Sequence, residues 1–351
     1  MTTSGILDAP PAHAPSQPEA AISRGRAGRA LRRGALALGR TALIVVPVFF
    51  LATIITFALG AASGLSPAAS LSGDEATPER IAAINAELGL DRPVVVQYLT
   101  WMGHVLAGDL GTSWYNGFPV VNLIAERLAI TASIAGLALL LAVIAGVGLG
   151  LLAAVFRGRS VDRAITGFTT LISTLPPFVV SIGLIIVLSV WLRLLPSSGY
   201  VPFEQDPVLW FKLILMPAIA LSFDPAADLA RQLRTGLVHV LEENYIVGAR
   251  ARGLSPSRIL WVHALRNGAG PAVAILGMKI PTLLGGAVVT ETIFSMPGFG
   301  MLAADSALRG DVPVVQGTLV VAVVLVLAFS LIVNVVLEAL QPATRRGARA
   351  A

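Results

Sequence analysis

Four ionisable side chains lie within or at the ends of long apolar runs: Asp224, Asp228, Lys279 and Glu291. A charged group is costly at membrane depth, so such residues usually pair with each other or serve a functional pathway. Asp224 and Asp228 lie near Arg231 at the end of a run, where an ordinary solvated cluster is the favoured interpretation. These four residues could therefore take part in ion coupling, in electrostatic gating or in simple ion pairing.

Lys279 and Glu291 are candidates for a pathway or a gate, together with Pro297 and Gly298 in the turn that follows. Lys279 lies early in its apolar run, and its ammonium group either extends to the interface or pairs with a carboxylate. Glu291 lies near the other end of that run, and it either faces a pathway or closes a hydrogen-bond network near the turn. Residue types alone leave both choices open.

A polar, arginine-bearing segment at residues 242–271 lies between two apolar runs. Acidic residues at its start and arginines further on predict a short helix from Glu242 to Arg252, because these charges complement the helix dipole. Gly253 is placed for a left-handed turn, and Ser255-Pro256 begins the next element. The expected product is a compact helix–turn–helix, and the alternative is an ordinary solvated loop. Three small residues would let another protein approach closely: Gly248, Ala249 and Ala251.

Motifs for catalysis by this chain are absent from the sequence. A phosphate-binding loop needs Gly-Lys-Ser/Thr, but the only lysines follow Phe211 and Met278. Neither His-Glu-x-x-His nor Gly-x-Ser-x-Gly occurs. There is no cysteine, and the four histidines are too scattered to predict a metal site: His13, His104, His239 and His263. We therefore expect no catalytic residue, no metal and no cofactor bound by this chain.

The composition is that of a membrane protein. The chain has 351 residues, of which 55% are hydrophobic and 13% charged, and its mean hydropathy is +0.80. So few polar residues cannot cover a soluble globule of this size. The net charge of +5 does not indicate nucleic-acid binding, because aromatic residues are not interleaved with the arginines.

Six apolar runs predict an all-α integral membrane protein with six transmembrane helices: residues 41–62, 129–155, 165–192, 211–230, 270–294 and 314–340. Eighteen Lys and Arg fall on one side of these spans and six on the other, so both termini and the 242–271 segment are expected in the cytoplasm. Residues 1–40 are expected to be a disordered basic tail, 63–127 an extracytoplasmic loop region and 342–351 a second tail. A secretory signal peptide is the alternative for the first run, whose length favours an uncleaved helix.

Glycines and prolines inside the runs predict how the helices pack. Gly146, Gly148 and Gly150 follow an i, i+2, i+4 spacing inside a span, which favours close helix packing over a nucleotide-binding turn. Prolines interrupt three spans, either as kinks that line a passage or as features that only shape the bundle: Pro176-Pro177, Pro217 and Pro281.

The segment Tyr245–Ser255, followed by His263–Asn267, resembles the cytoplasmic "EAA" loop of ABC importer permeases, in particular the dipeptide/oligopeptide branch. Further motifs resemble that branch in the same order: Leu88–Pro93, Gln97-Tyr98, Gly108–Ser113, Glu126–Leu128, Pro196–Gly199, Glu291–Phe294, Pro297–Gly300 and Pro313–Gly317. The resemblance covers roughly residues 41–342. It departs at Gly64–Pro67, where the branch usually has Pro-Gly-Asp-Pro, and at Val247, where the wider motif is acidic.

The resemblance implies a type I ABC importer permease domain at residues 128–341, with its coupling loop at 232–268. It implies a bacterial inner-membrane complex with a second permease, two ATPase subunits that carry ATP and Mg²⁺, and an extracytoplasmic substrate-binding protein. The residues expected to contact the ATPase are Glu243, Tyr245, Gly248, Ala249, Arg252 and Gly253. Peptides are the expected solute, and nickel or a sugar is the alternative.

Two other classes of function compete with the importer. In an ion-gradient-driven secondary transporter, Asp224, Asp228, Lys279 and Glu291 would couple ion and solute, and an internal repeat of spans would be expected. A membrane scaffold would leave the interrupted spans and the structured outer loops unexplained.

Overall fold

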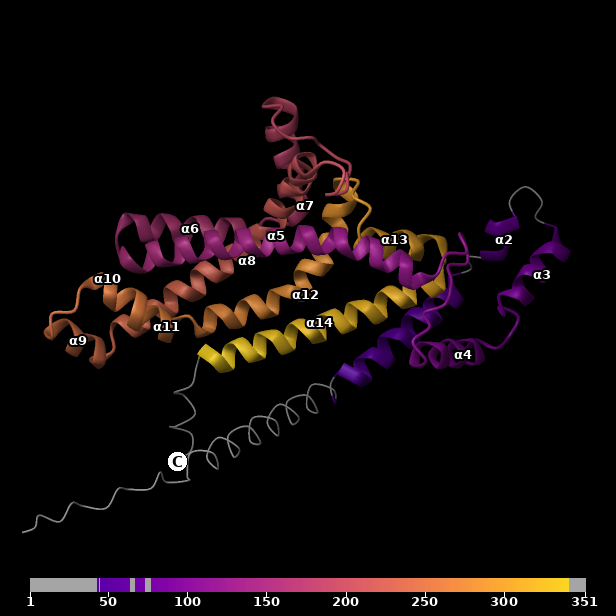
Figure 1. Cartoon of the computed structure of the whole chain (residues 1–351), viewed down its shortest axis with the longest axis horizontal. Coiled ribbons are helices and arrows are strands. Elements are labelled where there is room, and N and C mark those ends of the chain that lie inside the picture. Colours follow the sequence, from indigo (N-terminus) through magenta and orange to yellow (C-terminus); the bar gives the residue numbers. More distant parts are fainter. Residues whose placement is uncertain (1–42, 44, 64–66, 73–76, 341–351) are drawn as a thin grey trace, which may run out of the picture. The chain divides into compact units, whose positions relative to one another are not determined.

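Regular structure in the part of the chain that is described is helical throughout (Figure 1). The computed structural model describes residue 43 and residues 45–63, 67–72 and 77–340, and the only strand-like pairing in these ranges is an isolated bridge between Thr112 and Pro119. The tails predicted at 1–40 and 342–351 lie outside the described residues. A short unit ends at Ala52 and a larger unit begins at Thr53, and the first apolar helix, Val45–Ala62, includes that boundary.

Four more helices are long and apolar enough to cross a membrane: α5 (Val120–Val155), α8 (Pro207–Leu241), α12 (Gly270–Ile293) and α14 (Val312–Leu340). A sixth span is broken, because α6 (Ser160–Thr174) meets α7 (Pro177–Leu184) and the π-helix η2 (Ile185–Trp191) at an angle of 101°. Six spans are thus obtained when the bent pair counts as one, and the predicted all-α membrane architecture is confirmed.

The other helices lie between these spans in the sequence: α2 (Pro67–Ser72), α3 (Pro78–Glu87), α4 (Val94–Leu106), α9 (Asn244–Ala251), α10 (Pro256–Arg258), η3 (Ile259–Ala264), α11 (Leu265–Gly268) and α13 (Phe299–Arg309). The start of α3 follows its sequence signal, because the Thr77 side chain accepts a hydrogen bond from Arg80 N and Pro78 takes the first turn.

Three spans differ in extent from the apolar runs. Helix α5 begins at Val120 rather than at 129, because Glu126 and Arg127 interrupt the apolar pattern without breaking the helix. Helix α8 likewise continues beyond its apolar run to Leu241. The run at 165–192 is two helices, because Leu175, which precedes Pro176, adopts the extended conformation that a following proline favours. Pro217 and Pro281 remain inside α8 and α12.

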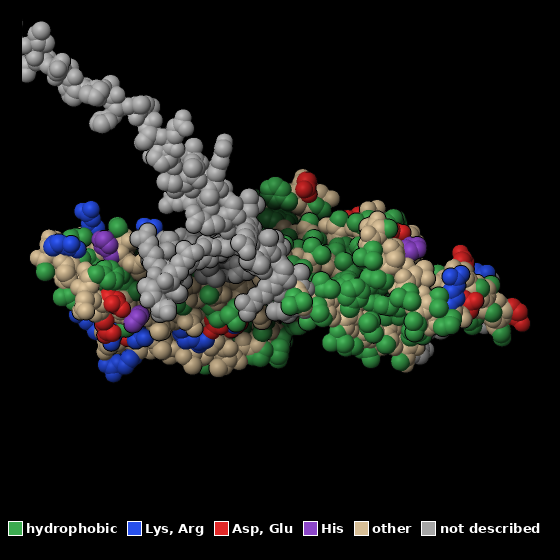
Figure 2. Space-filling model, turned by 90° about the horizontal axis from the view of Figure 1, so that it is seen from below, with side chains coloured by type: hydrophobic (Ala, Val, Ile, Leu, Met, Phe, Trp, Pro, Cys, Tyr) green, Lys and Arg blue, Asp and Glu red, His purple; other side chains and the backbone are tan. Residues whose placement is uncertain are grey.

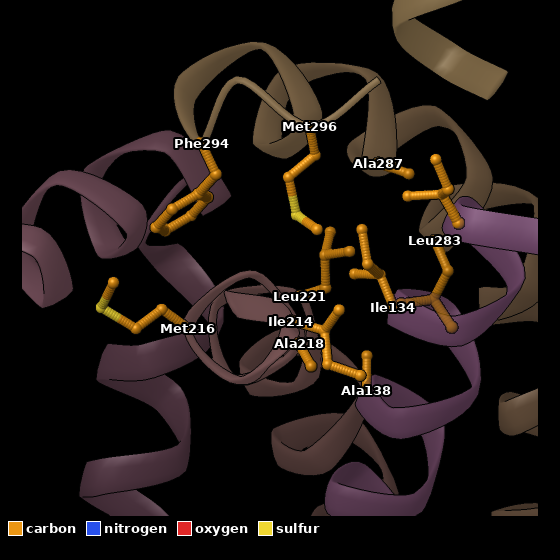
Figure 3. Packing of buried hydrophobic residues seen from close by; sticks show 11 residues of the cluster. Ile134, Ala138, Ile214, Met216, Ala218, Leu221, Leu283, Ala287, Phe294 and Met296 are labelled. Carbon is orange, nitrogen blue, oxygen red and sulfur yellow. The ribbon is translucent and has the colours of Figure 1, made fainter. Parts of the chain in front are cut away.

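The core of the bundle forms where α5, α8 and α12 meet. Ile134 and Ala138 from α5, Ile214 and Leu221 from α8, and Leu283 from α12 point toward one another (Figure 3). Beyond this cluster, the glycines of α5 bring its backbone against α8. A Cβ added at Gly150 would lie 2.9 Å from the carbonyl oxygen of Ala230, whereas a Cβ at Gly148 would meet nothing within 4 Å. The predicted packing role of the glycines therefore applies to Gly146 and Gly150.

Gly150→Ala should consequently destabilise the protein by about 1–3 kcal/mol, because the added methyl group overpacks the α5–α8 contact. The thermal midpoint of the purified protein in detergent measures the effect. Gly148→Ala is the matched control and should stay within about 0.5 kcal/mol of wild type. Equal midpoints for the two variants would contradict the packing of α5 on α8.

Candidate functional site

The 242–268 segment, called the knob below, is a helix–turn–helix at the end of α8. Helix α9 begins after Glu243, which occupies the N-cap position, and its last turn is followed by Gly253 at φ +78°. Leu254 N then donates to the carbonyl of Ala249 at 3.2 Å, which closes the turn. The Ser255 hydroxyl accepts from Arg258 N at 3.4 Å and begins α10. The predicted left-handed glycine and the second helix start are confirmed.

The knob is packed on the end of α8 rather than suspended from it. Ile246 and Ala249 on the inner face of α9 are buried in one cluster with Leu237 and Val240 of α8. Tyr245 accepts a hydrogen bond from Asn267 Nδ2 at 2.9 Å, which joins α9 to α11. The backbones of α8 and α11 are in direct contact. A Cβ added at Gly236 would overlap the carbonyl oxygen of Gly268. The knob and the end of α8 therefore form one packed unit.

The outer face of the knob exposes both apolar and cationic side chains. Four large apolar residues are between 44% and 56% exposed: Tyr245, Val247, Trp261 and Val262. Four arginines are exposed beside them: Arg250, Arg252, Arg258 and Arg266. At the end of the molecule where Figure 1 shows α9–α11, Figure 2 shows basic side chains gathered among acidic and scattered hydrophobic ones. Exposed apolar groups within a charged rim are typical of a surface that binds another protein.

The structure brings the six predicted coupling residues together on this knob but does not expose all of them. Ala249 is 2% exposed and belongs to the buried cluster that the knob shares with α8, so its contribution is to hold α9 in place. The other five, Glu243, Tyr245, Gly248, Arg252 and Gly253, are on the surface. A Cβ at Gly248 would meet nothing within 4 Å, so this chain itself has no steric need for glycine there.

Glu291 lies at a junction between three helices. Its side chain is fully buried near the end of α12. One carboxylate oxygen accepts from the Thr131 hydroxyl of α5, and the other accepts from Met301 N at 2.9 Å. Met301 is in the first turn of α13, where free N–H groups and the helix dipole attract an anion. Glu291 therefore closes a hydrogen-bond network at the turn, which was one of the two options that the sequence left open.

The turn between α12 and α13 fits tightly around this carboxylate. Phe299 N donates to the Thr131 hydroxyl at 2.8 Å, so Thr131 contacts both sides of the turn. Gly298 is buried, and an added Cβ would overlap the carboxyl group of Glu291. Pro297 is half-buried in the same turn, and Ser295 is one of the non-glycine residues with positive φ, at +49°. The predicted gate residues 291, 297 and 298 thus form one structural unit, which does not include Lys279.

Lys279 belongs to a separate ion-pair cluster between α8 and α12. Its ammonium group lies 2.7 Å from Asp224 Oδ2 and 2.6 Å from Asp228 Oδ2. Asp228 also pairs with Arg231, and Arg231 Nη1 donates to the Ser173 hydroxyl of α6 at 2.9 Å. The pairing of Asp228 with Arg231 was expected, but the cluster is not confined to the end of one helix. Lys279 pairs with carboxylates rather than extending to the interface.

Two further polar contacts could not be predicted from the sequence. Asp162 and Arg234 form a two-bond ion pair across 72 positions. Asp311, which precedes α14, accepts from the Ser113 hydroxyl at 2.5 Å and from Trp114 N at 3.2 Å. Burial raises the pKa of the Asp311 carboxyl above its ordinary value, although these hydrogen bonds act in the opposite direction. Partners so distant in sequence have no periodicity or local motif that would predict them.

Comparison with known proteins shows the family to which this chain belongs. Residues 146–346 match the family model for the binding-protein-dependent transport system inner membrane component, and residues 36–135 match the model for the N-terminal part of such membrane components. The chain belongs to this family of ABC transporter permeases. Members are membrane components of the transporter and are not themselves catalytic.

Relatives of the permease cover most of its length. It is 37% identical to the probable peptide ABC transporter permease protein y4tP of Sinorhizobium fredii, over 80% of this chain and 89% of that one. It is 36% identical to a putative peptide transport system permease protein of Brucella abortus, over 89% and 99%. The dipeptide transport system permease protein DppB of Escherichia coli is 35% identical over 86% and 96%.

The fold of the permease also occurs among solved structures. A chain of the MetNI methionine ABC transporter in an inward-facing conformation superimposes with a TM-score of 0.53 at 18% identity, covering 63% of this chain and 97% of that chain. The expected type I importer permease fold is thereby confirmed. Neither the family nor these relatives favour the ion-gradient transporter.

Proposed function

We propose that this permease, with a second permease, forms the translocation pathway for di- or oligopeptides in an ATP-driven importer of the bacterial inner membrane. Two ATPase subunits supply ATP hydrolysis with Mg²⁺, and an extracytoplasmic binding protein delivers the peptide. The names of the relatives support peptides as the solute. Both termini and the knob lie in the cytoplasm, which the distribution of arginines supports.

The observation that carries the proposal is the knob itself. It is a rigid helix–turn–helix with exposed apolar and cationic side chains, in a chain whose sequence has no phosphate-binding loop. Docking of the knob in a cleft of the ATPase would cover the exposed side chains, and it would supply the ATP hydrolysis for which this chain has no phosphate-binding loop. In this arrangement the exposed Tyr245, Val247 and Arg252 contact the ATPase, while the buried Ile246 transmits its movement to α8.

Uptake by the complex reconstituted in liposomes tests the function. The complex contains both permeases and both ATPases, the binding protein is added outside, and the probes are radiolabelled di- and tripeptides, nickel and a labelled sugar. We expect uptake of peptide that needs ATP inside the liposomes. Uptake driven by an ion gradient without the ATPases would overturn the proposal, and ATP-dependent uptake of nickel or sugar alone would replace the solute.

The Lys279 cluster and the Glu291 junction are the proposed pathway or gating elements. The Lys279 cluster joins α12 to α8, and the Glu291 junction joins α12 to α5. When the pathway changes the side of the membrane to which it opens, the joined helices must move together or these contacts must break. The Lys279 cluster is the better candidate for breaking, because its side chains are partly exposed, whereas Glu291 is fully buried.

Lys279→Met should destabilise the complex by about 1–3 kcal/mol, because Asp224 loses its cationic partner at membrane depth. Partial exposure keeps this below the cost for a fully buried pair. The thermal midpoint of the purified complex and peptide uptake are the measurements. Asp224→Asn in the same chain should restore part of the loss. Lys212→Met, which removes the other, exposed lysine, is the matched control, and equal effects of the two lysine variants would refute the role of the cluster.

A further inference from the structure

We propose that Asp162 and Arg234 are positioning residues that make α6 move with the knob. Displacement of the knob by the ATPase would then reach the bend between α6 and α7. This inference rests on the proposed function, because it starts from an ATPase docked on the knob.

The ion pair is built to fix one helix on another. Asp162 lies in the first turn of α6 and is 3% exposed. Its Oδ1 accepts from Arg234 Nε at 2.6 Å and its Oδ2 accepts from Arg234 Nη2 at 2.7 Å. Oδ2 also accepts from Gly158 N at 2.8 Å, in the turn before α6. Two parallel hydrogen bonds set both the distance and the direction of the partners, so α6 cannot slide along α8 while they last.

Arg234 belongs to the part of α8 that moves with the knob. Between Arg234 and the end of α8, Leu237 and Val240 share a buried cluster with Ile246 and Ala249 of α9, and Gly236 touches the backbone of α11. Closely packed protein interiors have low compressibility, so a displacement of the knob is transmitted to this part of α8. The start of α6 is therefore coupled to the knob through an ion pair in which Asp162 is buried and Arg234 is partly buried.

At its other end α6 meets the bend. Ser173 accepts a hydrogen bond from Arg231, one turn before Arg234 on α8. Two residues later the chain turns at Leu175-Pro176 by 101° into α7. Hinges are usually short segments of this kind at the ends of elements. Because α6 is held to α8 near both ends, its movement is passed to this bend.

A second ion pair offers a matched control. Arg157 pairs with Glu242, and thus joins the same turn before α6 to the same end of α8, but its side chain is 50% exposed and that of Glu242 is 58% exposed. Exposed pairs of this kind contribute little because water screens them. Arg157→Gln should therefore leave the movement of α6 unchanged, although it removes a charge close to Asp162.

The test uses the absence of cysteine from the sequence and needs no knowledge of the solute. Thr174→Cys places a single thiol on the exposed last residue of α6. Its labelling rate with a water-soluble maleimide is measured in the complex with its ATPases, without nucleotide and with ATP trapped by vanadate. We expect the two rates to differ about threefold or more, and we expect Asp162→Asn to remove the difference. Arg157→Gln should keep it.

Several outcomes would overturn the inference. The first is that the chain carrying only Thr174→Cys is labelled at equal rates in the two nucleotide states. The second is that Asp162→Asn leaves the difference between these labelling rates unchanged. The third is that Arg157→Gln removes this difference. If Asp162→Asn does not accumulate, Asp162→Asn with Arg234→Gln removes both charges and gives the answer. A purely structural role would lower the amount of complex but leave the difference intact in the folded fraction.

Gly253→Val in the same background separates this inference from the proposed function. Loss of the difference in Gly253→Val but not in Asp162→Asn overturns the role of the ion pair alone. Loss in Asp162→Asn but not in Gly253→Val overturns the docking of the knob instead.

Discussion

Gly253→Val should strongly reduce coupled uptake while the permease stays in the membrane. The left-handed backbone at φ +78° costs an L-residue roughly 1–2 kcal/mol, and more when it is β-branched. Relief of that strain reorients the turn between α9 and α10, and the docking surface is lost. Peptide uptake should fall by about tenfold or more, since 1.4 kcal/mol corresponds to a factor of ten. Uptake in reconstituted liposomes and the amount of permease in the membrane are the two measurements.

The control at this position is Gly253→Asn, because asparagine tolerates the left-handed region better than other non-glycine residues. It should retain most of the uptake. Normal uptake in Gly253→Val would remove the assignment of the knob as the coupling element, and equal losses in both variants would show that the side chain rather than the backbone matters.

Gly298→Ala should have the largest effect on stability. The added methyl group would overlap the Glu291 carboxyl group, which is fully buried and held by Thr131 and Met301. The carboxylate must give up at least one of these hydrogen bonds, each worth about 1.5–3 kcal/mol with a charged acceptor. Overpacking adds about 1–3 kcal/mol. We expect the thermal midpoint to fall sharply and little complex to assemble, as measured by fluorescence-detected gel filtration.

Gly285→Ala is the matched control for this prediction. Gly285 lies in α12, the helix that carries Glu291, and a Cβ there would meet nothing within 4 Å. Its midpoint should stay within about 0.5 kcal/mol of wild type. A normal midpoint for Gly298→Ala would mean that Glu291 does not occupy the pocket at the start of α13.

The signals that succeeded in the sequence were local ones. Apolar runs predicted the membrane architecture because hydrocarbon requires about 20 apolar residues per span. Gly253 and Ser255-Pro256 predicted the knob because left-handed turns and helix starts depend on neighbouring residues only. The boundaries failed where polar residues such as Glu126 and Arg127 occupy a helix that extends past the apolar run.

Contacts between distant residues could not be predicted in this way. Nothing local shows that Asp162 meets Arg234, or that Thr131 meets Glu291 across 160 positions. Lys279 was recognised as unusual, but only the packing of α12 on α8 selects Asp224 and Asp228 as its partners. Ala249 was placed on the docking surface by its motif, whereas the packing of α9 buries it.

The contact between Gly236 and Gly268 also bears on how the chain is made. Residues of α8 emerge from the ribosome before those of α11, yet the surface around Gly236 is shaped to receive the Gly268 backbone. The backbone at Gly236 thus lacks this contact until about thirty more residues have been added. A nascent chain arrested before residue 268 should therefore expose the end of α8 to chaperones and proteases. Completion of α11 is the step of synthesis that protects it.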